Sequence, residues 1–558
     1  MMFSLLRPIC PSAKALLLVC CMLASSAAFA AKVALDPSNW GHPEGENCVS
    51  CHEKSSPGLA QQWHDSAHKT AGVNCLDCHQ AEAAEPDAIE HEGQVIATIV
   101  SPKDCGRCHE KEYEEQAGSV HAEAYAIIRD RIPALAHNVT GAAMQAAGCD
   151  QCHGSLVKVR GDGTLDPKTW PNSGIGRINP DGSKGSCSSC HGRHAFSKAQ
   201  AREPSACVRC HSGPDSPDKE VFEASKHGML YAAQREQMNL HADTWVAGKD
   251  YTAAPTCTTC HMGAAGKIPT THDVGLRNAW TLNQPVSYQQ YLVLLADGSK
   301  LELPATAKPP KRGSELEKAD GSVAKVKAVI SPDRRRTVMS MVCLECHAKG
   351  FTEGFMTQFD NVVELYNSKF GEPAEAIMAG LYERDLLTPL PFDEPLEFIY
   401  WELWHDEGAR ARHGASMASA NHAWWEGMYL VGRNFYSRFL PEARAVAGDQ
   451  AAAIIDPVLA ESGKHEWLDA PSQANPILGW MPPPAPAADP MPVPAVEDGP
   501  SAASTTDAGT AVGAAQARAV GAEMPDADEP GAAADAVEPD AAQAADQAGG
   551  NSADAEAD

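Results

Sequence analysis

Residues 187–211, CSSCHGRHAFSKAQAREPSACVRCH, contain the pattern Cys-x-x-Cys-His twice. The same pattern occurs eight times in the chain, and we number the copies as motifs 1 to 8 in chain order. They are Cys48, Cys51 and His52; Cys75, Cys78 and His79; Cys105, Cys108 and His109; Cys149, Cys152 and His153; Cys187, Cys190 and His191; Cys207, Cys210 and His211; Cys257, Cys260 and His261; and Cys343, Cys346 and His347. Of the 19 cysteines, only Cys10, Cys20 and Cys21 lie outside these motifs.

The spacing within each motif has a specific chemical use. Two thiols one helical turn apart can add to the two vinyl groups of one haem, and the adjacent imidazole then reaches the iron. Disulfides, zinc sites and redox cysteine pairs do not require histidine at the next position. With 22 histidines in 558 residues, a given pair would be followed by histidine by chance about 4% of the time. The motifs therefore predict eight covalently attached haem c groups, with the cysteines as attachment sites and the histidines as iron ligands.

Eight haems attached between residues 48 and 347 leave only short segments between them. The macrocycles would supply much of the hydrophobic core, and their covalent bonds would restrict the unfolded chain as crosslinks do. The intervening segments are rich in Gly, Pro and Asp, with a helical pattern over residues 111–130. We expect a mainly α-helical multihaem cytochrome with little sheet.

A six-coordinate haem iron needs a second axial ligand, and 14 histidines lie outside the motifs. Three of them end a repeated pattern of a bulky residue, two others, Ser-x-His; these are His68, His121 and His227. Such a repeated local frame is what presentation of an imidazole to a haem face would produce. Further predicted ligands are His91, His194, His272 and His413, with His405 as the alternative to His413. His42, His137 and His465 have the sequence context of loop residues.

The two ends of the chain differ from its middle. Arg7 and Lys14 precede an apolar run that ends Ala28-Phe29-Ala30, which is typical of a secretion signal cleaved after Ala30. A lipid anchor on Cys20 is the alternative, although Val19 is larger than the residue that usually precedes a lipidated cysteine. No other run is long and apolar enough to predict a transmembrane helix.

The last 78 residues, from Met481, contain 15 acidic residues and one basic residue. With so few large apolar side chains, this segment is expected to be disordered. We therefore expect four segments: a signal peptide over 1–30, an octahaem-binding domain over 31–350, a C-terminal helical domain over 351–470 and an acidic Ala/Pro/Asp-rich tail over 481–558. The net charge of −28 argues against a nucleic-acid partner.

Several long stretches resemble the hydroxylamine oxidoreductase family of octahaem cytochromes. They are residues 169–217, CHMGAAGKIPTTHDVG (260–275), LYNSKFGEPAEAIMAGL (365–381) and ELWHDEGARARHGASM (402–417). The resemblance runs from about residue 48 to 440 and excludes a divergent stretch over 292–336. It implies a mainly α fold with a haem-rich N-terminal part and a C-terminal region of long helices. It also implies a homotrimer in the periplasm that exchanges electrons with a periplasmic or membrane-linked cytochrome.

The resemblance further implies that seven haems have two histidine ligands each, whereas the fourth is five-coordinate and catalytic. Here that haem would be attached to Cys149 and Cys152, with His153 as its proximal ligand. In members that oxidise hydroxylamine, a tyrosine of a neighbouring subunit is bonded to this haem. Counting back from Trp425-Glu426-Gly427-Met428-Tyr429 places His422 at that position, and Asn421 replaces the preceding aspartate. A second departure is Ser216, because Asp215 is commonly followed by histidine in the family.

A haem without the tyrosine crosslink resembles the reductive members of the family. We therefore expect reduction of nitrite, or nitric oxide, to hydroxylamine or ammonium, with His422 and Asp215 as proton donors. Oxidation of hydroxylamine or hydrazine is the alternative if Tyr429 or Tyr436 makes the crosslink. A multihaem electron conduit is a third possibility, in which His422 ligates the fourth iron; His422 could also be a packing residue. Trp424 and Trp425 are expected in the core or the trimer interface.

Overall fold

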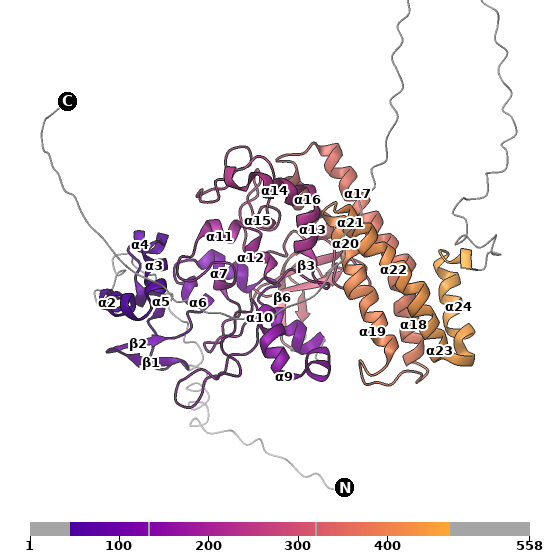
Figure 1. Cartoon of the computed structure of the whole chain (residues 1–558), viewed down its shortest axis with the longest axis horizontal. Helices are drawn as coiled ribbons and strands as arrows, with labels where there is room; N and C mark the ends of the chain where they lie inside the picture. Colours follow the sequence, from indigo (N-terminus) through magenta and orange to yellow (C-terminus); the bar gives the residue numbers. More distant parts are fainter. Residues whose placement is uncertain (1–44, 132–133, 319–320, 469–558) are drawn as a thin grey trace, which may run out of the picture. The chain divides into compact units, whose positions relative to one another are not determined.

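The computed structural model describes residues 45–131, 134–318 and 321–468, which all lie in one compact unit (Figure 1). The predicted signal segment, His42 and the predicted acidic tail lie outside the described residues, as does the side chain of His137. Helix α17 (Lys349–Tyr366) begins next to the domain boundary that was expected after residue 350, and the described residues on both sides of it belong to one compact unit. None of the described helices is long and apolar enough to cross a membrane.

Short helices joined by loops form the part that carries the motifs. In chain order they are α2 (Gly45–Ser55), α3 (Pro57–His64), α4 (Ala67–Thr70), α5 (Cys75–His79), α6 (Pro102–Gly106), α7 (Glu110–Ala117), α8 (Ala124–Ala126), η2 (Ile127–Arg131), η3 (Leu135–Val139), α9 (Gly141–Met144), η4 (Gln145–Cys149), α10 (Asp150–His153), η5 (Cys187–Ser189), α11 (Lys198–Arg202), α12 (Ser205–Val208), α13 (Asp218–Ala224), α14 (Lys226–Gln234), η6 (Arg235–Gln237), α15 (Cys257–His261) and α16 (Pro332–Cys343).

Local sequence explains why several motifs adopt a single helical turn. Asn74 and Ser101 precede motifs 2 and 3, and each makes a reciprocal capping box with an aspartate three residues later. Such caps satisfy the free N–H groups at the start of a helix. One helical turn places residues i and i+3 on the same face, so both cysteines of a motif face the same side.

The helix expected over residues 111–130 is interrupted in the structure. Helix α7 ends at Ala117, and the chain becomes helical again only at Ala124. The break follows Gly118, and the Ser119 hydroxyl donates a hydrogen bond to the carbonyl oxygen of Gln116, which closes the turn. This interruption turns the chain so that it presents His121.

The stretch that diverges from the resemblance contains a four-stranded antiparallel sheet. Its strands are β3 (Gln290–Leu295), β4 (Lys300–Pro304), β5 (Glu315–Glu317) and β6 (Val323–Ile330), in the spatial order β4-β3-β6-β5. Val293, Leu295 and Val326 form its buried cluster. A separate hairpin pairs β1 (Ala88–His91) with β2 (Gln94–Ala97). These strands are few, and the expectation of a mainly helical fold is confirmed.

Long helices follow α16, as expected, and Figure 1 shows them packed against one another. They contain α17, η7 (Asn367–Gly371), α18 (Glu372–Tyr382), α19 (Pro395–Trp401), η8 (Glu402–Glu407), α20 (Gly408–Ser416), α21 (Ala420–Ala423), η9 (Trp424–Met428), α22 (Tyr429–Asn434), η10 (Phe435–Phe439), α23 (Leu440–Ala447), η11 (Gly448–Gln450), α24 (Ala451–Ser462) and η12 (Glu466–Leu468). Segments η7 to η10 are π-helical turns that continue the α-helices on either side. Their core includes Tyr366, Ile377, Leu403, Phe435 and Phe439.

Candidate functional site

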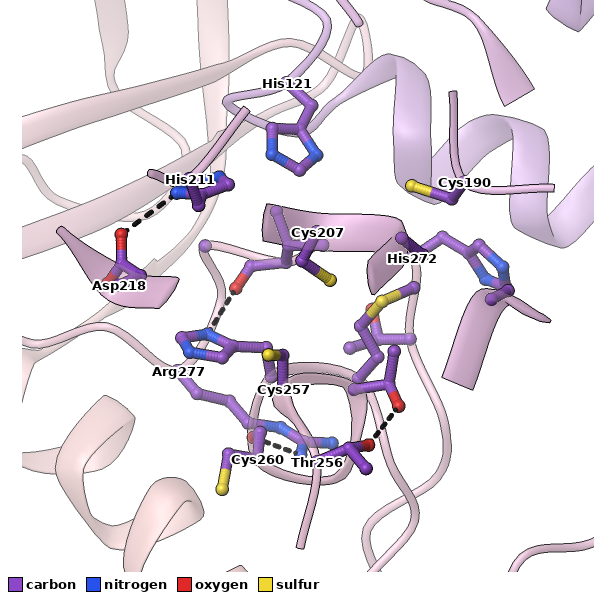
Figure 2. Close-up of a pocket in the computed structure, with 18 of the residues that line it drawn as sticks. His121, Cys190, Cys207, His211, Asp218, Thr256, Cys257, Cys260, His272 and Arg277 are labelled. Atoms are coloured by element: carbon purple, nitrogen blue, oxygen red, sulfur yellow. Dashed lines mark hydrogen bonds and ion pairs between the residues drawn. The ribbon is translucent and has the colours of Figure 1, made fainter. Parts of the chain in front are cut away.

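A single large cavity runs between the motifs. Its volume is about 3240 Å³, and residues of seven of the eight motifs line it, all except motif 1. One drug-sized ligand occupies a pocket of roughly 300–1,000 Å³, so this cavity has room for several large groups. Figure 2 shows part of it, with Cys207, Cys257, Cys260, His121 and His211 among the lining residues that are drawn. The combination of paired thiols, imidazoles and space fits covalently bound haem.

Six motif histidines face a second histidine ring at nearly constant spacing. The ring centroids are 6.1 to 6.5 Å apart in the pairs His52–His91, His68–His109, His79–His194, His121–His211, His191–His272 and His227–His347. An iron ion bound between two imidazoles, with metal–nitrogen bonds of about 2 Å, would hold the centroids roughly 6 Å apart. The structure thus brings six of the seven predicted second ligands to positions that suit this role.

The surroundings of these rings favour the form that binds iron. Burial lowers the pKa of His121 and of His191 to about 4. A ring with this pKa is neutral near pH 7, and neutral imidazole is the metal ligand. His211 differs, because its hydrogen bond with Asp218 raises its pKa above the ordinary value.

Cysteines of different motifs lie next to one another. The most strongly interacting thiol pairs are Cys48 and Cys75, Cys105 and Cys187, Cys152 and Cys210, and Cys207 and Cys257. Further interacting pairs are Cys78 and Cys108, Cys190 and Cys210, and Cys260 and Cys343. These contacts link motifs 1, 2, 3, 5 and 6 in that order. Motif 6 also adjoins motif 4 and motif 7, and motif 7 adjoins motif 8, so motif 6 is the branch point of the series.

Motif 4 has different surroundings. Among the described side chains, no second histidine ring stands opposite His153 at the spacing of the six pairs. The Nδ1 atom of His153 lies 3.3 Å from the carbonyl oxygen of Ala124, and burial lowers its pKa. Asp215 interacts electrostatically with both His153 and His405. His153, Asp215 and His405 therefore line the same cavity, with Asp215 within electrostatic range of both imidazoles.

His405 is held in a fixed orientation. It lies in the π-turn η8, and its ring stacks on Trp401 with a centroid distance of 3.9 Å. Burial lowers its pKa to about 4, although the charge of Asp215 opposes this. His405 lines the cavity together with Asp215 and Trp401.

His413 does not occupy the position expected of a second axial ligand. Its Nδ1 atom lies 2.9 Å from Asp218 Oδ1, and its Nε2 atom lies 2.8 Å from Asn283 Oδ1. Both ring nitrogens therefore have hydrogen-bond partners, which leaves neither for an iron. Within the described residues, no histidine ring stands opposite His261 of motif 7 at the spacing of the six pairs either.

His422 lies away from the cavity of its own chain, and its expected place beside the catalytic haem of a neighbouring subunit stays a prediction. His422 is buried, with Nδ1 3.1 Å from Ser419 Oγ and Nε2 3.4 Å from Glu426 Oε2. It is absent from the residues described as lining the cavity, whereas Asp215 is among them. The π-turn η9, which begins at Trp424, changes the phase of the helix, so Trp424 and Trp425 are exposed instead.

Comparison with known proteins is consistent with this geometry. Residues 178–290 match the family model "Seven times multi-haem cytochrome CxxCH", and residues 104–192 match "Cytochrome c554 and c-prime". The chain is 25% identical over 398 residues to a probable nitrite reductase–hydroxylamine oxidoreductase fusion protein of Kuenenia stuttgartiensis. This alignment covers 63% of the chain and 39% of the fusion protein. The chain is a hydroxylamine oxidoreductase-like multihaem cytochrome c.

Two solved structures have a similar fold. A hypothetical multiheme protein has a TM-score of 0.60 at 25% identity, covering 74% of this chain and 96% of that chain. A reducing hydroxylamine oxidoreductase-like protein complex of Kuenenia stuttgartiensis has a TM-score of 0.52 at 19% identity, covering 75% and 87%. The latter likeness shows the fold alone. This cytochrome spans about two-fifths of the length of the fusion protein.

Two residues of the site could not be given their roles from the sequence of this cytochrome. His405 was a candidate iron ligand, and nothing in its local pattern indicated that it would lie beside Asp215. Asp218 follows Asp215 by three residues, but its contacts with His211 and His413 join segments 195 residues apart. The only indication for Asp218 in the sequence was that it closely follows Ser216, which stands where the family commonly has histidine.

Proposed function

We propose that this cytochrome is an exported octahaem enzyme that reduces nitrite, or nitric oxide, toward hydroxylamine or ammonium at the haem on motif 4. Two observations together carry the proposal. Asp215 interacts electrostatically with both His153 and His405. Among the described side chains, no histidine ring stands opposite His153 at the spacing of the six pairs. Sequence similarity to a probable nitrite reductase–hydroxylamine oxidoreductase fusion protein supports a nitrogen-oxide substrate.

The motifs fit haem, which when bound supplies irons that pass single electrons and, where one axial position is free, an iron that can bind a small nitrogen compound. The residues of the chain would supply positions and protons. His153 would hold the haem on one side, and His52, His79, His109, His191, His211, His261 and His347 would do so at the other motifs. His68, His91, His121, His194, His227 and His272 would be the second ligands of six of them.

Reduction of a nitrogen oxide consumes protons and releases oxygen as water, so the site needs a proton supply. Asp215 carries a carboxyl group, and burial lowers the pKa of His405 to about 4, so this imidazole is neutral near pH 7. A carboxyl group and an imidazole can relay protons. Trp401 stacks on the imidazole and fixes its direction. We therefore assign proton delivery within one chain to Asp215 and His405, and His422 stays the donor predicted from a neighbouring subunit.

The oxidative alternative requires a tyrosine crosslink to the haem on motif 4. The hydroxyl of Tyr436 lies 3.1 Å from His465 Nδ1, so it has a partner within its own chain. Tyr429 is exposed and packs edge-on against Trp425. Neither tyrosine lines the cavity of its own chain in the described residues. The crosslink would come from a neighbouring subunit, where His422 stands at the tyrosine position. We therefore keep the reductive proposal, with a haem that lacks the crosslink.

We also propose a periplasmic homotrimer that receives electrons from a periplasmic or membrane-linked cytochrome. The exposed aromatic rings of Trp424 (54%), Trp425 (59%) and Tyr429 (46%) support a further protein contact on this helix surface. The fold is similar to that of a chain in a reducing hydroxylamine oxidoreductase-like protein complex, which is consistent with such assembly.

The test compares nitrite reduction by Asp215→Asn and His405→Gln with that of the parent, using a chemically reduced viologen dye as electron donor. We expect turnover to fall by roughly 10²- to 10⁴-fold, the usual contribution of a positioned acid–base group. The haem content should stay unchanged. His465→Gln is the matched control, because it replaces a buried histidine of the C-terminal part that is not among the residues lining the cavity. Parental turnover in both site variants would refute the assignment.

A further inference from the structure

Asp218 occupies a position that no other carboxylate of the structure shares. Its Oδ2 atom lies 3.1 Å from Nδ1 of His211, the histidine of motif 6. Three other motif histidines, His79, His153 and His261, have a backbone carbonyl oxygen near Nδ1 instead. In the described residues, His211 is the one motif histidine whose ring is paired with a carboxylate.

The carboxylate is held in place from two sides. The Ser216 hydroxyl donates a hydrogen bond to Asp218 Oδ2 at 2.9 Å, and His413 Nδ1 lies 2.9 Å from Asp218 Oδ1. These contacts fix the carboxylate against the edge of the His211 ring (Figure 2).

His413 is a second partner of the same carboxylate. Its Nδ1 atom lies 2.9 Å from Asp218 Oδ1, and its Nε2 atom lies 2.8 Å from Asn283 Oδ1. A hydrogen bond from His413 to Asp218 draws electron density from the carboxylate and weakens the hydrogen bond that Asp218 accepts from His211.

A carboxylate that accepts a hydrogen bond from an axial imidazole makes that imidazole a stronger electron donor to the metal. Stronger donation stabilises the oxidised iron and lowers the reduction potential. We propose that Asp218 is a positioning residue that lowers the reduction potential of the haem on motif 6 through His211. The inference rests on the axial ligation given in the proposed function, but it does not require nitrite as the substrate.

The position of motif 6 gives this tuning a consequence for electron transfer. Cys210 adjoins Cys152 of motif 4, and Cys207 adjoins Cys257 of motif 7. The haem on motif 6 would therefore stand at the branch point, directly beside the proposed substrate haem. A low potential there favours the movement of electrons onward to motif 4.

The test is a spectroelectrochemical titration of the haem-loaded full chain. In Asp218→Asn we expect the potential of one haem to rise, with about a tenfold change in its reduction equilibrium, or 59 mV for one electron. Asp218→Glu, which keeps a carboxylate, should restore much of the parental value. Glu397→Gln is the control, because it neutralises a buried carboxylate bound to Tyr382 and to backbone N–H groups, not to a motif histidine.

His413→Gln provides an independent test with the opposite sign. Loss of this second partner of Asp218 should strengthen the hydrogen bond between Asp218 and His211 and lower the potential of the same haem, and no new high-spin signal should appear. This variant decides the question if Asp218→Asn does not assemble with haem. The proposal would be overturned by unchanged potentials in Asp218→Asn or by an equal rise in Glu397→Gln. It would also be overturned if His413→Gln left the potential unchanged, raised it, or produced a high-spin signal. A parent protein that does not reduce nitrite would refute the proposed function and leave these shifts intact.

Discussion

Glu407 is a buried carboxyl group two residues after His405, and its environment makes it sensitive to pH. Burial raises its pKa to about 7, although a hydrogen bond with Asn434 opposes the shift. Because the folded-state pKa exceeds the ordinary value of 4.5, the native state binds the proton more tightly than the unfolded state. Its contribution to stability is fully present below about pH 4.5 and is lost as the pH rises to about 7.

We therefore predict that Glu407→Gln stabilises the protein at pH 8 but not at pH 5. The gain at pH 8 should approach roughly 3 kcal/mol, the free-energy equivalent of this shift. Apparent melting temperatures of the haem-loaded protein at the two pH values provide the measurement. Glu383→Gln, an exposed carboxyl at the end of α18, should have little effect at either pH. An equal gain at both pH values for Glu407→Gln would contradict the account.

Residues differ in how far their positions could be predicted from the sequence. His68, His121 and His227 recur in one local frame, and each lies opposite a motif histidine in the structure. Their presentation depends on a few neighbouring residues, which a sequence pattern records. The orientation of His422 depends on the phase of a helix that contains π-turns, and side-chain pattern alone does not report an extra residue in a turn.

Close approach of the C-terminal helices limits the size of the side chains at the points where they cross. A Cβ atom at Gly427, in η9, would lie 2.5 Å from the Cα atom of Ala411 in α20. Ala411 is fully buried, so neither backbone has room to shift. The crossing of these two elements therefore depends on glycine at position 427, and it holds α20, which follows His405, against η9.

We predict that Gly427→Ala destabilises the C-terminal helices by about 1–3 kcal/mol, the usual cost of overpacking. Gly432→Ala in α22 is the matched control, because its Cβ atom would lie 4.0 Å from Phe370, an ordinary contact. That variant should be neutral or stabilising by about 0.5–1 kcal/mol, since alanine favours the helix. Thermal unfolding followed by far-UV circular dichroism makes the comparison. Equal stability of the two variants would argue against close packing at Gly427.

The helices were easier to predict from the sequence than the sheet. The long C-terminal helices followed from the family resemblance and are present. The sheet β4-β3-β6-β5 falls within a stretch that departs from the family pattern. Its strands pair across turns through backbone groups, and β4 and β5 each place only part of their side chains in the core. The sequence therefore carried a weak signal for it.

The molecule as a whole is organised by its motifs. Residues of seven motifs line one cavity, and neighbouring cysteines connect all eight motifs into a branched series. The presence of the motifs could be predicted fully from the sequence, because each is a contiguous pattern. Their order in space could not, because contacts such as Cys105 with Cys187 join distant segments.

We predict that intact-mass spectrometry of the mature protein shows eight haems attached to a chain that begins at Ala31. Each motif contains the two thiols needed for attachment, and the apolar N-terminal run ends at a cleavage pattern. A variant with Cys343→Ala and Cys346→Ala should carry one haem fewer, with the same N-terminus. Seven or fewer haems in the undegraded parent would contradict the interpretation of at least one motif.

The central claim is that the haem on motif 4 is where a small nitrogen compound binds, beside Asp215 and His405. The most direct test is a crystal structure of the haem-loaded protein soaked with nitrite. We predict that nitrite binds the iron of the haem attached to Cys149 and Cys152. It should lie on the side opposite His153 and within reach of Asp215 or His405. A protein side chain bound to that iron as its sixth ligand, or nitrite bound at another haem only, would contradict it.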